Sequence, residues 1–253
     1  INLSQFDIFS ISKLEMSSGQ VQNHYSTASS YVKSNLISIY STLFDLPTKK
    51  TNLKLMGNAS SINAYQAGLF YQQKLSKHVS FGVQSLYQFG SGTYDFNIQN
   101  IDSTYSSERQ DSRLKILKLK GGITYQKNKL KIHLNSNYTD NQQKLPGAVV
   151  LYNPYNDQSL KNKTLNSTLT GQYKSKHIAI GTNLFIQNNE TTYRDNQYLN
   201  AQGFLENRYN NETFGGGFIF HKFLKFESQK VFIGSDFKQT ILTGDQFGKS
   251  PLR

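Results

Sequence analysis

The stretch VSFGVQSLYQF, residues 79–89, alternates between two kinds of side chain. Its odd positions are apolar or aromatic with one serine, and its even positions are mostly small or polar. Such a period of two indicates an extended strand with one apolar face. The same pattern recurs in residues 117–125, 165–173 and 178–186. The lysines, glutamines and asparagines of the polar faces would be costly in a dry core and are tolerated where water reaches them.

About nine strands are expected from this pattern, paired hairpin by hairpin into an antiparallel sheet. They are predicted at 51–62, 64–75, 78–92, 113–126, 129–139, 164–174, 177–189, 212–223 and 230–242. Segments of about 9–13 residues are long enough for a tilted strand to cross a bilayer. Tyr71, Tyr125 and Tyr173 close apolar faces at the turn end, where a membrane barrel has an aromatic girdle.

The connections between these segments alternate in length. Tight joins that carry lysine are expected at 74–78, 126–129, 174–177 and 223–230. Long polar loops are expected at 95–112, 140–163 and 188–211. Tight turns at one end and long loops at the other are typical of outer-membrane barrels. The sequence therefore predicts an all-β fold, an antiparallel up-and-down transmembrane β-barrel. Because bacterial single-chain barrels have even strand numbers, we expect the barrel to be partial.

Composition restricts the possible classes of protein. The chain has 253 residues and no cysteine, which excludes disulfides, thiolate metal sites and a cysteine nucleophile. Its mean hydropathy is −0.56. It contains no apolar run of about 18 residues, so no membrane-spanning helix is predicted. A low mean hydropathy is compatible with a barrel, since only every second residue of a strand meets lipid.

The net charge of +12 raises the question of nucleic-acid binding. Proteins that bind nucleic acid gather lysine and arginine on one face or arm. Here the lysines occur largely at strand ends and turns, where ammonium groups can meet lipid phosphates. We therefore expect outer-membrane lipid as a partner and no nucleic acid.

Residues 1–46 differ from the rest of the chain. Their alternation is loose, residues 26–34 are rich in serine, and a further strand candidate lies at 36–43. We expect a small element at 1–46 and the barrel wall at 47–253.

The sequence resembles the TonB-dependent outer-membrane receptors, particularly those of Bacteroidetes-type bacteria. INLSQFDIFSISKLEMSSGQ, residues 1–20, resembles the end of their plug domain, where a short strand such as Ile11–Met16 is followed by glycine, here Gly19. Residues 52–96 resemble their first barrel strands. LPGAVVLYNPYNDQSL, residues 145–160, resembles a long-loop motif of the vitamin B12-type or siderophore-type subgroup.

The resemblance implies a fragment that covers the plug end and the first barrel strands of a receptor in the Gram-negative cell outer membrane. Such a receptor binds a scarce nutrient, a corrinoid or a ferric siderophore, with its long extracellular loops. Energy comes from the TonB complex, which is reached through N-terminal parts that are missing from this chain. The resemblance implies transport rather than catalysis and requires no cofactor.

Two predicted loops supply candidate ligand-binding residues, because aromatic faces, amides and arginine suit a large polar ligand. The candidates are Leu145, Pro146, Gly147, Tyr152, Asn153, Tyr155, Asn156, Tyr193, Tyr198, Arg208 and Tyr209. Two alternatives stay open. Leu145, Pro146 and Gly147 also form an ordinary turn sequence, and exposed loop aromatics can pack against their neighbours.

Catalytic and metal motifs are missing from the sequence. The 5 histidines do not have a metal-ligand spacing, and neither a G-x-S-x-G elbow nor a clear carboxylate pair is present. The glycines at 215–217 are expected near the start of a strand, where they relieve crowding against the plug or permit a bend. A second hypothesis is a structural or adhesive outer-membrane barrel whose loops bind surface glycans or proteins.

Overall fold

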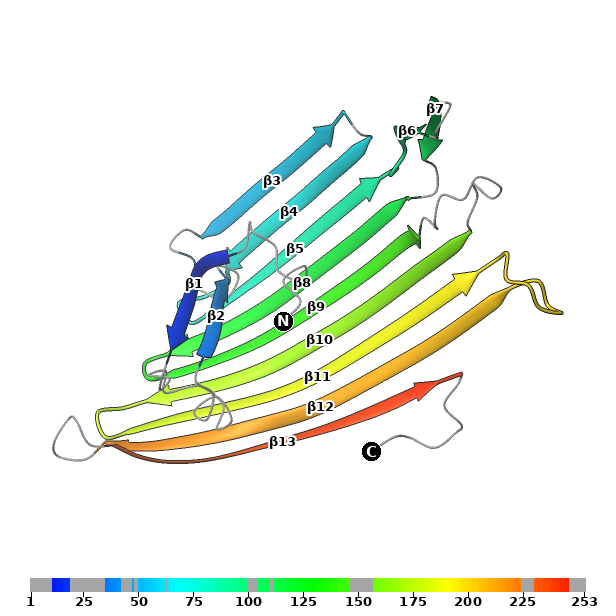
Figure 1. Ribbon diagram of the computed structural model, residues 1–253. Coiled ribbons are helices and arrows are strands. Elements are labelled where there is room, and N and C mark those ends of the chain that lie inside the picture. Colours follow the sequence, from blue (N-terminus) through cyan, green and yellow to red (C-terminus); the bar gives the residue numbers. More distant parts are fainter. Residues whose placement is uncertain are drawn as a thin grey trace.

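The computed structural model describes residues 11–18, 35–41, 47, 50–61, 63–99, 104–109, 112–145, 157–223 and 230–245. Every regular element within these ranges is a β-strand (Figure 1). The strands are β1 (Ile11–Ser18), β2 (Asn35–Ser41), β3 (Thr51–Ser60), β4 (Ala64–Lys74), β5 (Val79–Gly90), β6 (Tyr94–Gln99), β7 (Thr104–Arg109), β8 (Leu114–Lys127), β9 (Leu130–Leu145), β10 (Gln158–Lys174), β11 (Ile178–Asp195), β12 (Leu205–Phe223) and β13 (Lys230–Gly244).

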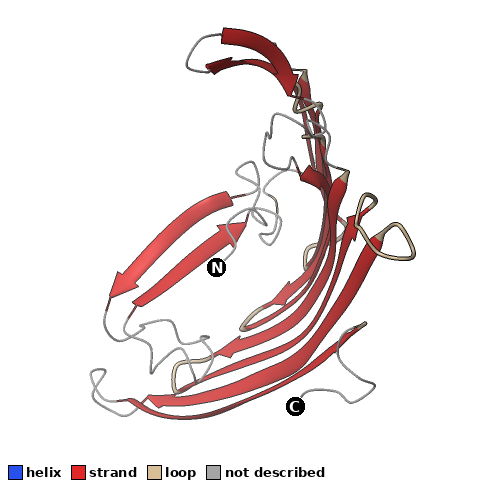
Figure 2. Cartoon of the chain, turned by 45° about the vertical axis from the view of Figure 1, so that its right-hand side comes forward, coloured by secondary structure: helices blue, strands red, loops and turns tan. Residues whose placement is uncertain are grey.

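The main body is a 9-stranded sheet with the order β13-β12-β11-β10-β9-β8-β5-β4-β3. Every neighbouring pair in it is antiparallel. The sheet curves strongly about an axis along its strands, so that it has one concave and one convex side (Figure 2). This architecture is a partial up-and-down β-barrel, as the alternation in the sequence predicts.

The strands become longer across the sheet, from 10 residues in β3 to 19 in β12. The predicted loops at 140–163 and 188–211 were therefore too long. β9 continues to Leu145 and β10 begins at Gln158, while β11 continues to Asp195 and β12 begins at Leu205. Beyond the apolar band both faces of these strands are polar, so alternation no longer distinguishes them from loops.

The tight joins lie at one end of the sheet, as predicted (Figure 1). Leu75 N–H donates to the Val79 carbonyl at 2.9 Å, and Ser175 N–H donates to the Ile178 carbonyl at 2.7 Å. The remaining join, at 224–229, lies outside the described residues. One short turn, between β3 and β4, lies at the opposite end. There Asn63 adopts the left-handed conformation, with φ of 53°.

The predicted loop at 95–112 contains a separate hairpin, β6–β7. The hairpin projects past the ends of β5 and β8 (Figure 1). Its strands are 6 residues each and were missed in the sequence, where serines and charged residues obscure the alternation.

β1 and β2 form a second two-stranded sheet with antiparallel pairing. Figure 2 shows this hairpin on the concave side of the main sheet. β2 confirms the strand candidate at 36–43, shifted by one or two residues. The boundary proposed between 46 and 47 falls where most residues lie outside the described ranges.

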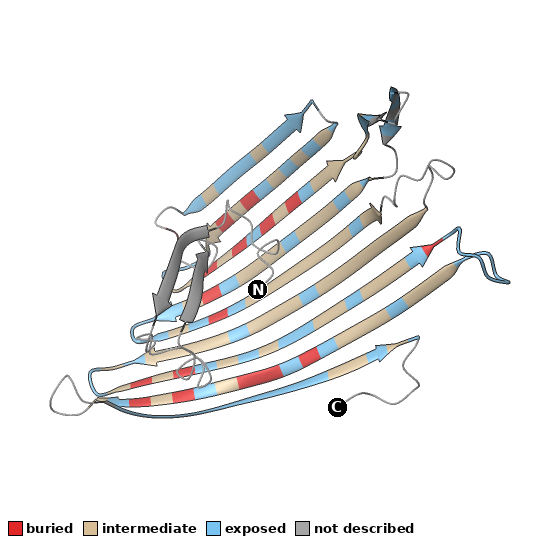
Figure 3. Ribbon diagram, viewed as in Figure 1, coloured by how far each residue is buried: buried red, intermediate tan, exposed pale blue. Residues whose placement is uncertain are grey.

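The two faces of the main sheet are opposite in character to those of a soluble sandwich. In β5, Ser80 and Gln84 are buried, with 1% and 7% of their surface exposed, whereas Val83 and Tyr87 are 41% and 45% exposed. Figure 3 shows buried positions alternating with less buried ones along parts of β4, β5, β11 and β12. Side chains converge on a concave surface and splay on a convex one, so the polar set lies inside and the apolar set outside.

The apolar outer set forms a continuous band because strand register places like residues side by side. One row joins Ile123 to Leu134, then to Leu169 and Leu184, across β8 to β11. Along β8 the band runs from Leu117 to Tyr125, a length of roughly 26 Å at about 3.3 Å per residue. No helix within the described residues is long and apolar enough to cross a membrane.

Gly215, Gly216 and Gly217 lie in the middle of β12, not near its start. A Cβ atom on Gly215 would lie 2.5 Å from the Phe237 carbonyl oxygen of β13. On Gly216 it would lie 2.6 Å from Leu184 of β11. The glycines relieve crowding against the two neighbouring strands. The expected position was wrong because strand ends were placed too far inward.

Candidate functional site: the inner wall and its mouth

The inner face of β8 to β13 is lined by amides, hydroxyls and lysines. The cross-strand register places these residues in rows. One row consists of Lys120, Asn137, Asn166, Gln187, Thr213 and Thr240. The next consists of Lys118, Thr139, Thr164, Asn189, Asn211 and Leu242. Rows of this kind make a hydrophilic wall over most of the concave surface.

Some of these polar atoms pair with one another. Thr164 donates to the Asn189 side-chain oxygen at 2.8 Å, and the Thr213 and Thr240 hydroxyls lie 3.1 Å apart. In contrast, the buried amide oxygens of Asn135, Asn137 and Asn141 accept no hydrogen bond from the described residues. An unpaired buried amide oxygen is costly, so these three groups require water or another partner on the concave side.

A small hollow lies among Gln84, Lys118, Lys120, Asn137 and Thr139 on this wall, with a volume of about 20 Å³. A volume of that size holds about one water molecule. Leu86, Leu119 and Tyr138 also line the hollow, and its polar side chains can supply hydrogen-bonding partners. The wall is therefore suited to hydration between strands.

At the end with the long connections, polar side chains form a chain of contacts that we call the mouth network: Lys144, Asp157, Asn196, Arg194, Glu206 and Arg208. It begins with an ion pair between Lys144 at the end of β9 and Asp157 just before β10. The Asn196 amide donates to Asp157 at 2.6 Å. These contacts join β9, β10 and the turn after β11.

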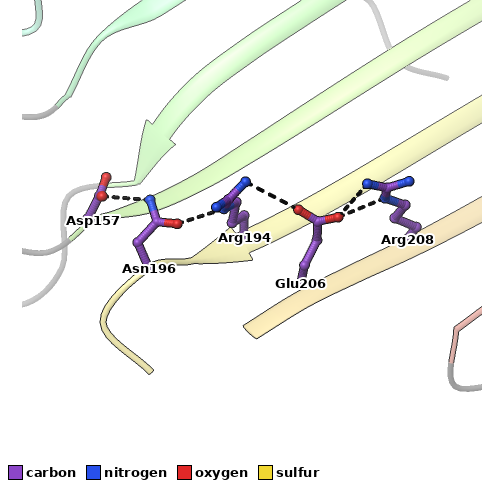
Figure 4. Close-up of polar contacts among 5 residues, drawn as sticks. All are labelled: Asp157, Arg194, Asn196, Glu206 and Arg208. Atoms are coloured by element: carbon purple, nitrogen blue, oxygen red, sulfur yellow. Dashed lines mark hydrogen bonds and ion pairs between the residues drawn. The ribbon is translucent and has the colours of Figure 1, made fainter. Parts of the chain in front are cut away.

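The second half of the mouth network continues across β11 and β12 (Figure 4). Arg194 Nε donates to the Asn196 side-chain oxygen at 2.6 Å, and its terminal nitrogen lies 3.6 Å from Glu206. Arg208 donates to Glu206 through two nitrogens, at 2.9 and 2.6 Å. The network therefore fixes the spacing of four strands where they project beyond the apolar band.

The mouth network affects the acidity of Asp157. The hydrogen bond from Lys144, followed by the one from Asn196, holds the pKa of the Asp157 carboxyl below its ordinary value of 3.8. Both donors favour the ionised form. Asp157 is therefore charged at neutral pH and keeps its partners in place.

Five of the residues predicted from the sequence can be placed. Leu145, Tyr193 and Tyr209 occupy inner-face positions of β9, β11 and β12, as their register with inner-face partners shows. Arg208 lies on the outer face, bound to Glu206. Tyr198 lies in the turn between β11 and β12 and is 45% exposed.

The remaining candidates are Pro146, Gly147, Tyr152, Asn153, Tyr155 and Asn156, which lie outside the described residues. The structure therefore brings Tyr193 and Tyr209 together on one face and separates Arg208 from them. Arg208 and Tyr209 are adjacent in the chain, and adjacent residues of a strand point to opposite faces. Treating this segment as a loop concealed that separation.

Tyr193 and Tyr209 are diagonal neighbours on the inner face of β11 and β12. Tyr209 is paired with Thr191, two residues before Tyr193, and Tyr193 is paired with Asn207, two residues before Tyr209. Burial, then the charge of Asp195 and the phenol of Tyr198, raise the pKa of the Tyr193 phenol. Tyr193 therefore stays protonated and can donate a hydrogen bond at any physiological pH.

Sequence reasoning missed Lys144, Asp157, Asn196 and Glu206 as members of a common cluster. Their separations along the chain follow no motif, and only strand register brings them together. The sequence carried no signal for the cluster, because both faces of these strands are polar beyond the apolar band. No group of three or more histidines, aspartates or glutamates within the described ranges could hold a metal ion.

Comparisons with known proteins support the fold. No protein-family model matches the sequence, and no curated protein matches it. Among solved structures, the chain is similar to the siderophore receptor PiuA from Acinetobacter baumannii, with a TM-score of 0.63 at 11% sequence identity. The similarity covers 94% of this chain and 36% of that chain. At this identity the likeness shows the fold alone, a partial β-barrel.

Proposed function

We propose that this chain forms part of the wall of a TonB-dependent receptor in the outer membrane, which takes up a scarce nutrient. The observation that carries the proposal is the inversion of the sheet's faces. An exposed apolar band on the convex side matches lipid, and a polar concave side matches a hydrated lumen. The proposed plug end, residues 1–46, includes the β1–β2 hairpin on the concave side.

The proposed ligand is a ferric siderophore or a corrinoid. Both are large and polar, and both match a wall of amides and hydroxyls. Tyr193 and Tyr209 lie on this wall at the end of the sheet with the long connections. Likeness to a structure described as a siderophore receptor makes the ferric chelate the first ligand to test. TonB supplies energy in this proposal, and no residue of this chain is assigned to that coupling.

Uptake by cells tests the proposal. The protein is expressed in a Gram-negative strain without its own receptors, and ⁵⁵Fe-labelled ferrichrome, ⁵⁵Fe-labelled enterobactin and labelled cyanocobalamin are supplied in turn. We expect accumulation of one of them that ceases when TonB is deleted or the proton gradient is collapsed.

Binding of none of these compounds by the membrane-inserted protein would remove the nutrient assignment. Binding of surface glycans or proteins without accumulation of any small molecule would favour the adhesive hypothesis instead.

A further inference from the structure

A groove on the outer face of the sheet is lined by four cationic side chains. It has a volume of about 210 Å³ and is lined by Arg113, Lys115, Gln142, Gln143, Lys144, Ser159, Leu160 and Lys161. We call it the lysine groove. It lies over β8, β9 and β10 at the end with the long connections, and no carboxylate belongs to its lining.

Strand register explains why the cations gather there. Lys115 and Lys161 are both partners of Gln142, one on each side. They therefore belong to the same face, with backbones about 10 Å apart. Arg113, Lys144 and Ser159 lie one row further out, since Lys144 N–H donates to the Arg113 carbonyl at 2.9 Å and Lys144 is the partner of Ser159.

Three of the four cations have no carboxylate partner among the described residues: Arg113, Lys115 and Lys161. Lys144 is bound to Asp157. The nearest acid in the adjoining row is Asp140, which accepts a hydrogen bond from Gln142 at 3.3 Å. The groove therefore carries excess positive charge, which is unfavourable unless an anion or water compensates it.

The position of the groove indicates what that anion is. The next outer-face residue of β8 after Lys115 is Leu117, the partner of Tyr87, and the row after that contains Leu119, Tyr138 and Leu165. On β9 and β10 the row beside Leu117 contains Asp140 and Lys163 and is polar. The cations therefore lie about 7 Å beyond Leu117 and about 13 Å beyond the row of Leu119, Tyr138 and Leu165. In a bilayer this is the level of lipid head groups.

We infer that the lysine groove binds the phosphate of a phosphorylated glycolipid in the outer leaflet, whose acyl chains lie along the apolar band below it. The inference rests on the proposed outer-membrane location. Two ammonium groups, one guanidinium and the Ser159 hydroxyl can all donate to phosphate oxygens, and hydrogen bonds between charged groups are the strong ones. This site is separate from nutrient binding, because it lies on the opposite face of the sheet from Tyr193 and Tyr209.

Lipid binding by the purified protein in detergent tests the inference, with bisphosphorylated lipid A, the dephosphorylated lipid and inorganic phosphate as probes. The variant is Lys115→Gln with Lys161→Gln. We expect its affinity for bisphosphorylated lipid A to fall about tenfold or more. The matched control, Lys127→Gln with Lys176→Gln, makes the same charge change at the tight-turn end and should keep the wild-type affinity.

The other probes identify the source of the phosphate. Dephosphorylated lipid should bind the wild type as weakly as lipid A binds the variant, and millimolar inorganic phosphate should not displace lipid A. Displacement by free phosphate would overturn the assignment to a lipid. Equal loss in the control would show a general charge effect and overturn the site.

A conservative pair of substitutions guards against misfolding. Lys115→Arg with Lys161→Arg keeps both charges and should retain lipid A, and each variant is checked for membrane insertion by its heat-modifiable migration on gels. If the wild type is inserted but does not prefer the phosphorylated lipid, only this inference is wrong. If the wild type does not enter the outer membrane, the proposed function is wrong as well.

Discussion

Lys144 and Asp157 form an ion pair across the two ends of the connection between β9 and β10. Asn196 also donates to Asp157, at 2.6 Å, so one carboxylate ties three polypeptide segments together. The ion pair holds the end of β9 next to the start of β10.

The stability contributed by Asp157 should depend on pH. Its folded-state pKa is lowered, chiefly by the Lys144 hydrogen bond, so the native state binds a proton less tightly than the unfolded chain. The contribution is present above pH about 3.8 and is lost as pH falls through the lower folded-state pKa.

Asp157→Asn should therefore cost about 0.5 kcal/mol of unfolding free energy at pH 7, as expected for a partly exposed pair, and less at pH 3. Urea unfolding in micelles at the two pH values measures the difference. An equal cost at both would show that the carboxylate charge is not responsible.

Leu134→Arg should destabilise the protein in a bilayer by about 2–4 kcal/mol, because Leu134 lies in the middle of the apolar band. Leu134 is 46% exposed, so in a soluble sheet the same substitution would cost little. Asn166→Arg, on the polar inner wall, is the control and should be tolerated. Reversible unfolding from liposomes gives both values, and a neutral Leu134→Arg would contradict the lipid-facing assignment.

Gly215→Ala should reduce stability by about 1–3 kcal/mol, because it overpacks the sheet. The new Cβ would lie 2.5 Å from the Phe237 carbonyl oxygen, and backbone cannot move aside as a flexible side chain can. Gly121→Ala is the matched control, since a Cβ there meets nothing within 4 Å. The shift in urea midpoint compares the two. If both substitutions had the same effect, the close approach of β12 and β13 would be wrong.

Tyr193→Ala and Tyr209→Ala should each weaken nutrient binding by roughly 1 kcal/mol or more, about fivefold, if these rings contact the ligand. Thr192→Ala is the control. Thr192 is next to Tyr193 in the chain but lies on the outer face of β11, so its replacement should leave the affinity unchanged. Calorimetric titration of the ligand identified by the uptake assay makes the comparison. Equal affinity in all three variants would move the binding site elsewhere on the wall.

Local alternation was sufficient to predict the nine strands of the sheet and which of their faces are apolar. In β5 the odd positions are apolar in the sequence, and Val83 and Tyr87 among them are exposed in the structure. The physical reason is that side chains of a strand alternate between two faces, so composition at every second position reports the environment of each face. The lysine-bearing turns were predictable for the same reason, as interruptions of that period.

Strand ends were less predictable. Beyond the apolar band both faces meet water, and residues 188–195 and 205–211 have no alternation that separates strand from loop. Their pairing depends on continued backbone hydrogen bonding between β11 and β12, and that is a property of two strands rather than one. The missed β6–β7 hairpin is another case of the same kind.

By itself, then, the sequence determined the fold class and the inside and outside of the wall, because both follow from the period of two. Only the tertiary structure decided which distant residues meet. Register brings Lys115 and Lys161 to either side of Gln142, and links Arg194 to Glu206. Register depends on how whole strands align with their neighbours, and the mouth network and the lysine groove exist only once that alignment is fixed.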